Sequence, residues 1–144
     1  MPDELSHLGS LKFTTRRQDA ADESVFTDLP VTVTISHVVA DAEQCHISYR
    51  RQLEREDSNQ EEQHSFALGD IDELKVEPFE SFENEHQGQP GWVYTLTDPE
   101  ISAVVITHRD GRMDWFAVRA GAIAQRLRED IQRRGDYCRR HAAP

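Results

Sequence analysis

The sequence predicts a mainly β domain of the α+β class. We expect a curled antiparallel sheet, or partly open barrel, of about seven strands closed by one C-terminal amphipathic helix. Three observations support this prediction. Several short stretches alternate β-branched and polar residues, an Asp-Gly pair separates the last two of them, and after Gly121 the apolar residues take helical spacing. The 144 residues fit one domain with a buried core, so we assign residues 1–144 to it, with a core of about residues 10–135 and flexible ends.

The first strands are predicted at residues 10–17, 31–39 and 45–54. In the second of these, Val and Ile occupy one face and Thr and Ser the other, which is the period-two pattern of a half-buried strand. Residues 18–30 are predicted to be an acidic connection. Arg51 falls on the apolar face of the third strand, so we expect it at the rim of the sheet or at a bulge.

Two polar stretches are predicted to be loops. Residues 55–64 contain no apolar side chain, so they have nothing to bury and are predicted to be mobile. Apolar spacing returns over residues 65–79, and this stretch ends near Pro78. Residues 80–91 are predicted to form a second polar loop.

Three short strands are predicted at residues 92–98, 102–109 and 112–118. Asp110-Gly111 between the last two predicts a hairpin with a type I′ turn, which needs positive φ at both central positions. The last strand carries apolar side chains on both faces, so both of its faces are expected to be covered.

The final element is predicted to be an amphipathic helix that covers the open end of the curled sheet. Its apolar stripe follows helical spacing and consists of Ala120, Ile123, Ala124, Leu127 and Ile131. Arginines flank the stripe and complement the negative end of the helix dipole. Glycine is common just after the last residue of a helix, so the helix is predicted to stop at Gly135.

Charge is unevenly distributed along the chain. Residues 1–108 carry 7 basic and 22 acidic residues, a net charge of −15, whereas residues 109–144 carry 9 basic and 5 acidic residues, a net charge of +4. The acidic bulk argues against nucleic acid as a partner and against tight adhesion to an anionic membrane, because both need many cationic contacts. The basic C-terminal part is the exception.

The order of the elements resembles the pleckstrin-homology-like fold, the group that includes PH, PTB and GRAM domains, of which this chain would be a diverged member. Three stretches carry the resemblance. FALGDIDELKVEP is similar to the fourth strand of such domains, with Asp-Ile before the next strand. VVITHRDGRMDWFAV is similar to their last hairpin, and RAGAIAQRLREDIQRR to their closing helix.

The cysteines and the chain ends bear on location. Cys45 and Cys138 lie far apart and form no CxxC motif, so we expect two reduced thiols in an intracellular protein. MPDELSHLGS lacks an apolar stretch of signal-peptide length, and no segment approaches the roughly 18 apolar residues of a membrane span. The sequence therefore predicts a cytoplasmic protein.

No catalytic residue, metal ligand or cofactor is predicted. His108-Arg109-Asp110 spells part of a protein-kinase catalytic loop, but Trp115 stands where that loop has Asn, and the glycine-rich loop is missing from the sequence. The seven histidines show no zinc-site spacing, and we expect them at the surface or rim of the sheet. The sequence contains no G-x-S-x-G nucleophile motif. We therefore expect a non-enzyme.

The resemblance implies two kinds of ligand. Many PH domains hold inositol phosphates at the open end of the sheet with basic residues. The matching positions here are Lys12, Arg16, Arg17, Arg50 and Arg51. PTB-type relatives instead add a peptide strand to a sheet edge beside the helix.

The resulting prediction is a non-catalytic binding or scaffolding module that recognises a protein or peptide, with a phosphoinositide-binding membrane-targeting domain as the alternative. Arg126, Arg133 and Arg134 on the helix are predicted to meet an acidic partner. A solvated helix face is the simpler interpretation of these arginines. A homodimer is also compatible with the sequence.

Overall fold

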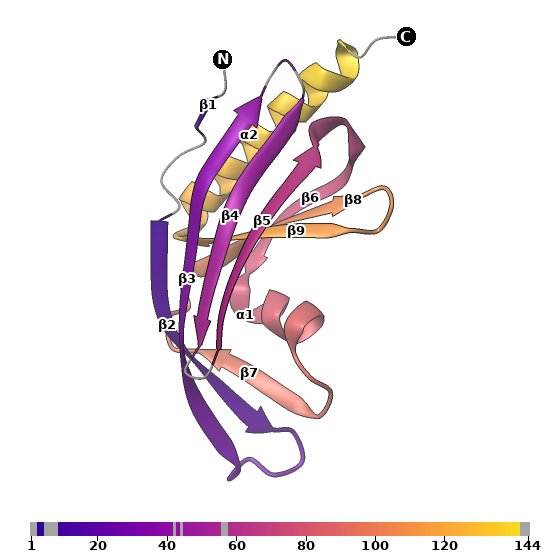
Figure 1. The fold of residues 1–144 in the computed structure, drawn as a ribbon. Coiled ribbons are helices and arrows are strands. Elements are labelled where there is room, and N and C mark those ends of the chain that lie inside the picture. The colour runs from indigo at the N-terminus through magenta and orange to yellow at the C-terminus, as the bar shows by residue number, and fades with distance from the viewer. Residues whose placement is uncertain (1–2, 5–8, 42, 44, 56–57, 142–144) are drawn as a thin grey trace.

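The computed structural model describes residues 3–4, 9–41, 43, 45–55 and 58–141, and it confirms the predicted fold class. A large antiparallel sheet curls around a smaller three-stranded sheet, and the C-terminal helix α2 lies along one end of the large sheet (Figure 1). Residues 1–2, 5–8 and 142–144, part of the ends predicted to be flexible, lie outside the described residues.

The large sheet has the strand order β5-β4-β3-β2-β7, and short β1 pairs with the end of β3. Its strands are β1 (Asp3–Glu4), β2 (Gly9–Asp19), β3 (Phe26–Asp41), β4 (His46–Arg55), β5 (Ser58–Ala67) and β7 (Trp92–Leu96). The predicted period-two pattern is confirmed, because alternate residues of β2, β3 and β4 are buried on the concave side. A bulge in β3 between Ser36 and Val39 shifts the register, and Val38 and Ala40 then point into the core.

Two predicted loops in this sheet are largely strand. The acidic connection shortens to residues 20–25, because β2 and β3 continue as a paired hairpin from Gln18 and Phe26. Residues 58–64, predicted to be mobile, belong to β5, which pairs with β4 along its whole length; residues 56–57 lie outside the described part. An edge strand obtains its hydrogen bonds from one neighbour, so it forms without apolar side chains of its own.

The small sheet has the order β6-β8-β9, with β6 at Ile71–Pro78, β8 at Ile101–His108 and β9 at Met113–Arg119. The apolar stretch of residues 65–79 divides between two strands, β5 and β6. A short 3-10 helix, η1 (Leu68–Asp70), separates β5 in the large sheet from β6 in the small one. The chain therefore turns the corner between the two sheets at η1.

The last hairpin and the cover on both of its faces are confirmed, but the turn type is not. In β9, Trp115, Phe116 and Val118 are all buried. Gly111 donates a backbone hydrogen bond to His108 O (2.9 Å), and φ is positive at Gly111, at 89°, but not at Asp110. This is the three-residue loop in which a type I turn precedes one left-handed residue, so a single glycine suffices.

Residues 80–91, predicted to be a loop, are partly helical. Helix α1 (Phe79–Phe82) continues into a π-helix, η2 (Glu83–Gln87). Phe79 and Phe82, one turn apart, pack against Trp115 in the core. Asn84 both accepts a hydrogen bond from Tyr94 N (2.8 Å) and donates one to Tyr94 O (2.9 Å), so its amide occupies part of the open edge of β7.

Helix α2 (Gly121–Arg140) is confirmed, but it does not end at Gly135. A Cβ at position 135 would lie 3.4 Å from Leu68 O, so glycine serves close approach to η1 instead of a helix end. One more turn follows, and it ends in a disulfide between Cys138 and Cys45. The prediction of two reduced thiols is therefore wrong, because only the fold brings together cysteines separated by 93 positions.

Candidate functional site

The five predicted anion-binding residues do not form one site. Lys12, Arg16 and Arg50 are exposed on the outer face of the large sheet, whereas Arg51 points to the concave side. On the neighbouring strand β3, Asp28 lies opposite Arg16 and Ser36 lies opposite Arg50. At roughly 3.3 Å per residue, Asp28 and Ser36 are about 26 Å apart along β3, so Arg16 and Arg50 are too far apart to bind a single inositol phosphate together.

Arg16 and Arg17 are already engaged at the tip of the β2–β3 hairpin. Arg16 donates two hydrogen bonds to Asp28, at 2.7 and 3.1 Å, and lies over the ring of Phe26. This pairing holds the pKa of Asp28 below its usual range. Arg17 is half-buried and lies over the Trp92 ring, 4.6 Å from its centroid. Arg16 is thus committed to Asp28 and Phe26, and Arg17 to the Trp92 ring.

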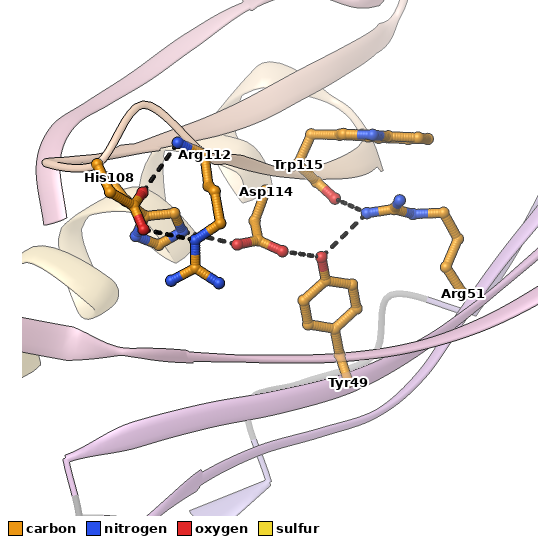
Figure 2. Close-up of polar contacts among 7 residues, drawn as sticks. Tyr49, Arg51, His108, Arg112, Asp114 and Trp115 are labelled. Carbon is orange, nitrogen blue, oxygen red and sulfur yellow. Dashed lines mark hydrogen bonds and ion pairs between the residues drawn. The ribbon is translucent and has the colours of Figure 1, made fainter. Parts of the chain in front are cut away.

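Arg51 is buried, with only 6% of its surface exposed, and it bridges the two sheets. Its guanidinium stacks on the Trp115 ring at 3.9 Å and donates to Trp115 O (2.9 Å) and to the Tyr49 hydroxyl (3.1 Å). Figure 2 shows Tyr49 and Arg51 reaching from the large sheet toward the hairpin of the small one. The prediction of a rim or bulge position for Arg51 is therefore wrong.

The polar network continues from Tyr49 into the small sheet. The Tyr49 hydroxyl donates to Asp114, and Asp114 is also hydrogen-bonded to His108 Nε2 at 2.7 Å (Figure 2). Burial raises the pKa of the Tyr49 hydroxyl above its ordinary value, so the phenol keeps the proton that it donates. These contacts join β4, β8 and β9 and fix how the sheets lie on each other.

His108 is therefore a structural residue. It is 3% exposed, so the prediction of a surface or rim position is wrong for this histidine. Asp110, the third letter of the kinase-like triplet, is exposed and pairs with Arg112 at 2.7 Å. The histidine and that aspartate thus belong to different environments, because His108 pairs with Asp114 between the sheets and Asp110 lies at the exposed turn.

Glu83 is a buried carboxylate in η2 whose side chain is 4% exposed. Burial raises its pKa, and Arg55, 3.8 Å away, opposes the rise only in part. The pKa of Glu83 is then higher in the folded protein than in the unfolded chain. The charged carboxylate therefore lowers the free energy of unfolding at neutral pH. Acidification through the window between the two pKa values removes this penalty.

Replacing Glu83 by glutamine is expected to abolish that gain on acidification and to raise stability at pH 7 by up to about 1 kcal/mol. Urea unfolding of the wild type and the variant between about pH 4 and pH 8 measures both effects. Glu85→Gln is the matched control, because Glu85 lies in the same π-helix with its side chain 56% exposed. Parallel pH curves for Glu83→Gln and the wild type would contradict the assignment.

One group of metal-binding residue types occurs in the described part of the chain. Glu77, Glu85 and His86 place possible ligand atoms within 4.8 Å of one another. Glu85 and His86 are exposed, and Glu77 already pairs with Lys75 at 3.4 Å. Two exposed side chains beside a carboxylate that already pairs with Lys75 do not by themselves define a metal site, so we assign no ion here.

A groove of about 340 Å³ lies along the C-terminal half of α2. It is lined by Ala40 of β3, Leu68 of η1, and Asp130, Arg133, Arg134, Tyr137 and Cys138 of α2. Ala40, Leu68 and Cys138 are buried and make the base of the groove apolar. Tyr137 is 49% exposed, an aromatic surface beside this base.

The groove contains two of the three arginines predicted to meet a partner. Asp130 accepts hydrogen bonds from Arg133 (3.1 Å) and Arg134 (3.2 Å), so the charged lining residues sum to +1. Arg133 keeps 77% of its side chain exposed, and a guanidinium has five N–H donors. Arg126 is exposed about two helical turns earlier and does not line the groove.

The sheet edge beside the helix is the other place where a peptide was expected. Strand β6 packs against α2 and, among the described strands, pairs only with β8. Its residues include Asp72, Glu73, Glu77 and the closing Pro78. Charged residues and proline on an edge strand discourage strand addition. The groove, which combines an apolar base with arginines, is therefore the stronger candidate.

Sequence reasoning found the helix arginines but not the groove. Its base comes from β3, η1 and α2, which lie far apart in the sequence, and Tyr137 lies beyond the predicted helix end. No family model, curated protein or solved structure matches this chain. None of the described helices combines the length and apolar character that crossing a membrane requires.

Proposed function

We propose that this protein is a non-catalytic binding module that recognises an acidic segment of a protein partner, with the groove along α2 as its binding site. The observation that carries the proposal is the combination in one groove of an apolar base, two arginines and an exposed tyrosine. An apolar side chain of the partner fits the base, and neighbouring carboxylates pair with the arginines.

The charge distribution supports an acidic partner. The groove lies in the basic C-terminal part of a chain whose remainder is strongly acidic, so the rest of the molecule repels an acidic segment and the helix attracts it. The phosphoinositide alternative lacks comparable support, because its basic residues are dispersed, paired or buried. The predicted cytoplasmic location stays a prediction, and a disulfide in that compartment would be redox-regulated.

Fluorescence polarisation with a labelled peptide that has one phenylalanine between two pairs of glutamates tests the site. Arg133→Ala plus Arg134→Ala is expected to weaken binding about tenfold, since two charge-assisted contacts are lost. Arg126→Ala removes an arginine of the same helix outside the groove and serves as the matched control. It is expected to change the affinity by less than about twofold.

Equal losses of peptide affinity in Arg126→Ala and in Arg133→Ala plus Arg134→Ala would show that the peptide responds to the net charge of the protein and does not bind in the groove. Flotation with phosphoinositide-containing vesicles tests the alternative in the same preparation. Strong vesicle binding that disappears in Arg16→Ala plus Arg17→Ala would overturn the protein-binding proposal in favour of membrane targeting.

A further inference from the structure

Both cysteines of the disulfide are connected to the groove. Cys138 lines it directly. Cys45 acts on it through the backbone, because Cys45 O accepts a hydrogen bond from Leu68 N at 2.7 Å, and Leu68 forms part of the apolar base. The disulfide therefore joins the last turn of α2 to Cys45 in the β3–β4 connection, and the backbone of Cys45 holds Leu68 of η1 in place.

The last turn of α2 depends on this bond. After Gly135, the buried residue of the helix is Cys138. Tyr137 stacks on His141 and Arg139 pairs with Asp136, and these contacts stay within the C-terminal segment itself. Arg139 Nη1 also reaches Ile71 O, but at 3.5 Å. The covalent bond thus ties this turn directly to the β3–β4 connection.

The backbone of Cys45 gives a second reason for a change on reduction. Its φ is 53°, in the left-handed region that residues other than glycine adopt at an energetic cost. The bond to Cys138 helps to hold it there, so cleavage allows Cys45 to relax. A shift of Cys45 reaches Leu68 through their hydrogen bond.

We propose that the Cys45–Cys138 disulfide is a redox switch for the α2 groove, and this inference rests on the proposed function. In the oxidised protein the last turn of α2 is held beside Leu68, and the groove accepts the acidic segment. In the reduced protein the turn detaches. Tyr137 and Cys138 then leave the lining, and the segment binds more weakly.

The switch uses thiol–disulfide exchange with a dithiol. One thiolate of the dithiol attacks Sγ of Cys45, forms a mixed disulfide with it and releases Cys138 as a thiolate. The second thiol of the dithiol then attacks the dithiol sulfur of that mixed disulfide and releases Cys45. The protein gains two electrons and two protons as two thiols, and the dithiol becomes a disulfide. Cys45 is half-buried and Cys138 is buried, so Cys45 is the accessible sulfur and Cys138 leaves as the thiolate.

The test compares the full chain in its oxidised form, the same chain treated with dithiothreitol, and Cys45→Ser plus Cys138→Ser. Hydrogen exchange reports on residues 136–141, and the glutamate-flanked phenylalanine peptide reports on the groove. Reduction is expected to speed exchange in residues 136–141 by about tenfold, whereas β3 and β8 keep slower exchange than residues 136–141, because they open only when the whole domain unfolds. It is expected to lower peptide affinity roughly fivefold, because fewer molecules hold the competent groove.

The variant Cys45→Ser plus Cys138→Ser is expected to show the hydrogen exchange and peptide affinity of the reduced protein. Dithiothreitol is expected to change neither quantity in this variant. Unchanged exchange in residues 136–141, or exchange in β3 and β8 as fast as in residues 136–141 after reduction, would overturn the switch. Equal peptide affinity in the oxidised and reduced proteins would overturn it while leaving the proposed function intact. Absence of peptide binding in all three samples would instead defeat the proposed function, and the switch with it.

Discussion

Replacing Cys138 by serine is expected to lower the free energy of unfolding by about 4–5 kcal/mol. The disulfide joins residues separated by 93 positions, so it removes a large amount of conformational freedom from the unfolded chain. Urea unfolding under oxidising conditions measures the loss. The slope of free energy against urea is expected to rise in the variant, because an uncrosslinked unfolded chain is more expanded.

Three controls separate the cross-link from the side-chain change. Dithiothreitol is expected to destabilise the wild type by about the same 4–5 kcal/mol. It is expected to leave Cys45→Ser plus Cys138→Ser unaffected. Ala122→Ser, at an exposed position of α2, is expected to cost no more than about 0.5 kcal/mol. A loss below about 1 kcal/mol for Cys138→Ser would mean that the bond contributes little to the fold.

Replacing Arg51 by alanine is expected to destabilise the protein by about 3 kcal/mol. The change removes a guanidinium that is packed on Trp115 and hydrogen-bonded to Trp115 O and the Tyr49 hydroxyl. It leaves a cavity between the sheets and a carbonyl without its donor. Urea unfolding gives the loss, and near-ultraviolet circular dichroism reports the altered surroundings of Trp115.

Arg50→Ala is the matched control, because Arg50 is the neighbouring arginine on the exposed face of the same strand. It is expected to change stability by less than about 0.5 kcal/mol. Arg51→Met keeps most of the buried volume without the charge and is expected to lose less than Arg51→Ala. Similar small losses for Arg50→Ala and Arg51→Ala would contradict the bridging role of Arg51.

The strands that alternate apolar and polar residues were predictable from the sequence. In β3 and β4 one face must be buried, and side chains of successive residues point to opposite faces, so the pattern itself specifies a strand. The first six residues of strand β5, residues 58–63, gave no such signal. All six are exposed, and β4 supplies their hydrogen bonds. This part of β5 forms because β4 lies beside it, and the residue pattern of β5 alone does not indicate that β4 will be there.

The candidate site was predictable only in part. Arg133 and Arg134 were identified from their position on a basic helix flank, a local property. The family resemblance assigned both Arg50 and Arg51 to an anion site, yet adjacent residues of a strand face opposite sides of the sheet. The alternation that predicted β4 already implied this separation. It could not show that Trp115 would receive the buried guanidinium.

By itself the sequence determined the fold class, most of the strands, the last hairpin and the amphipathic helix, because these follow from contacts between residues near each other in the chain. The tertiary structure decided the disulfide, the path of α2 past Gly135, the burial of Arg51 and His108, and the groove. Each of these depends on which distant surfaces meet when the two sheets pack. That outcome is set by the burial of the whole core and not by any local pattern.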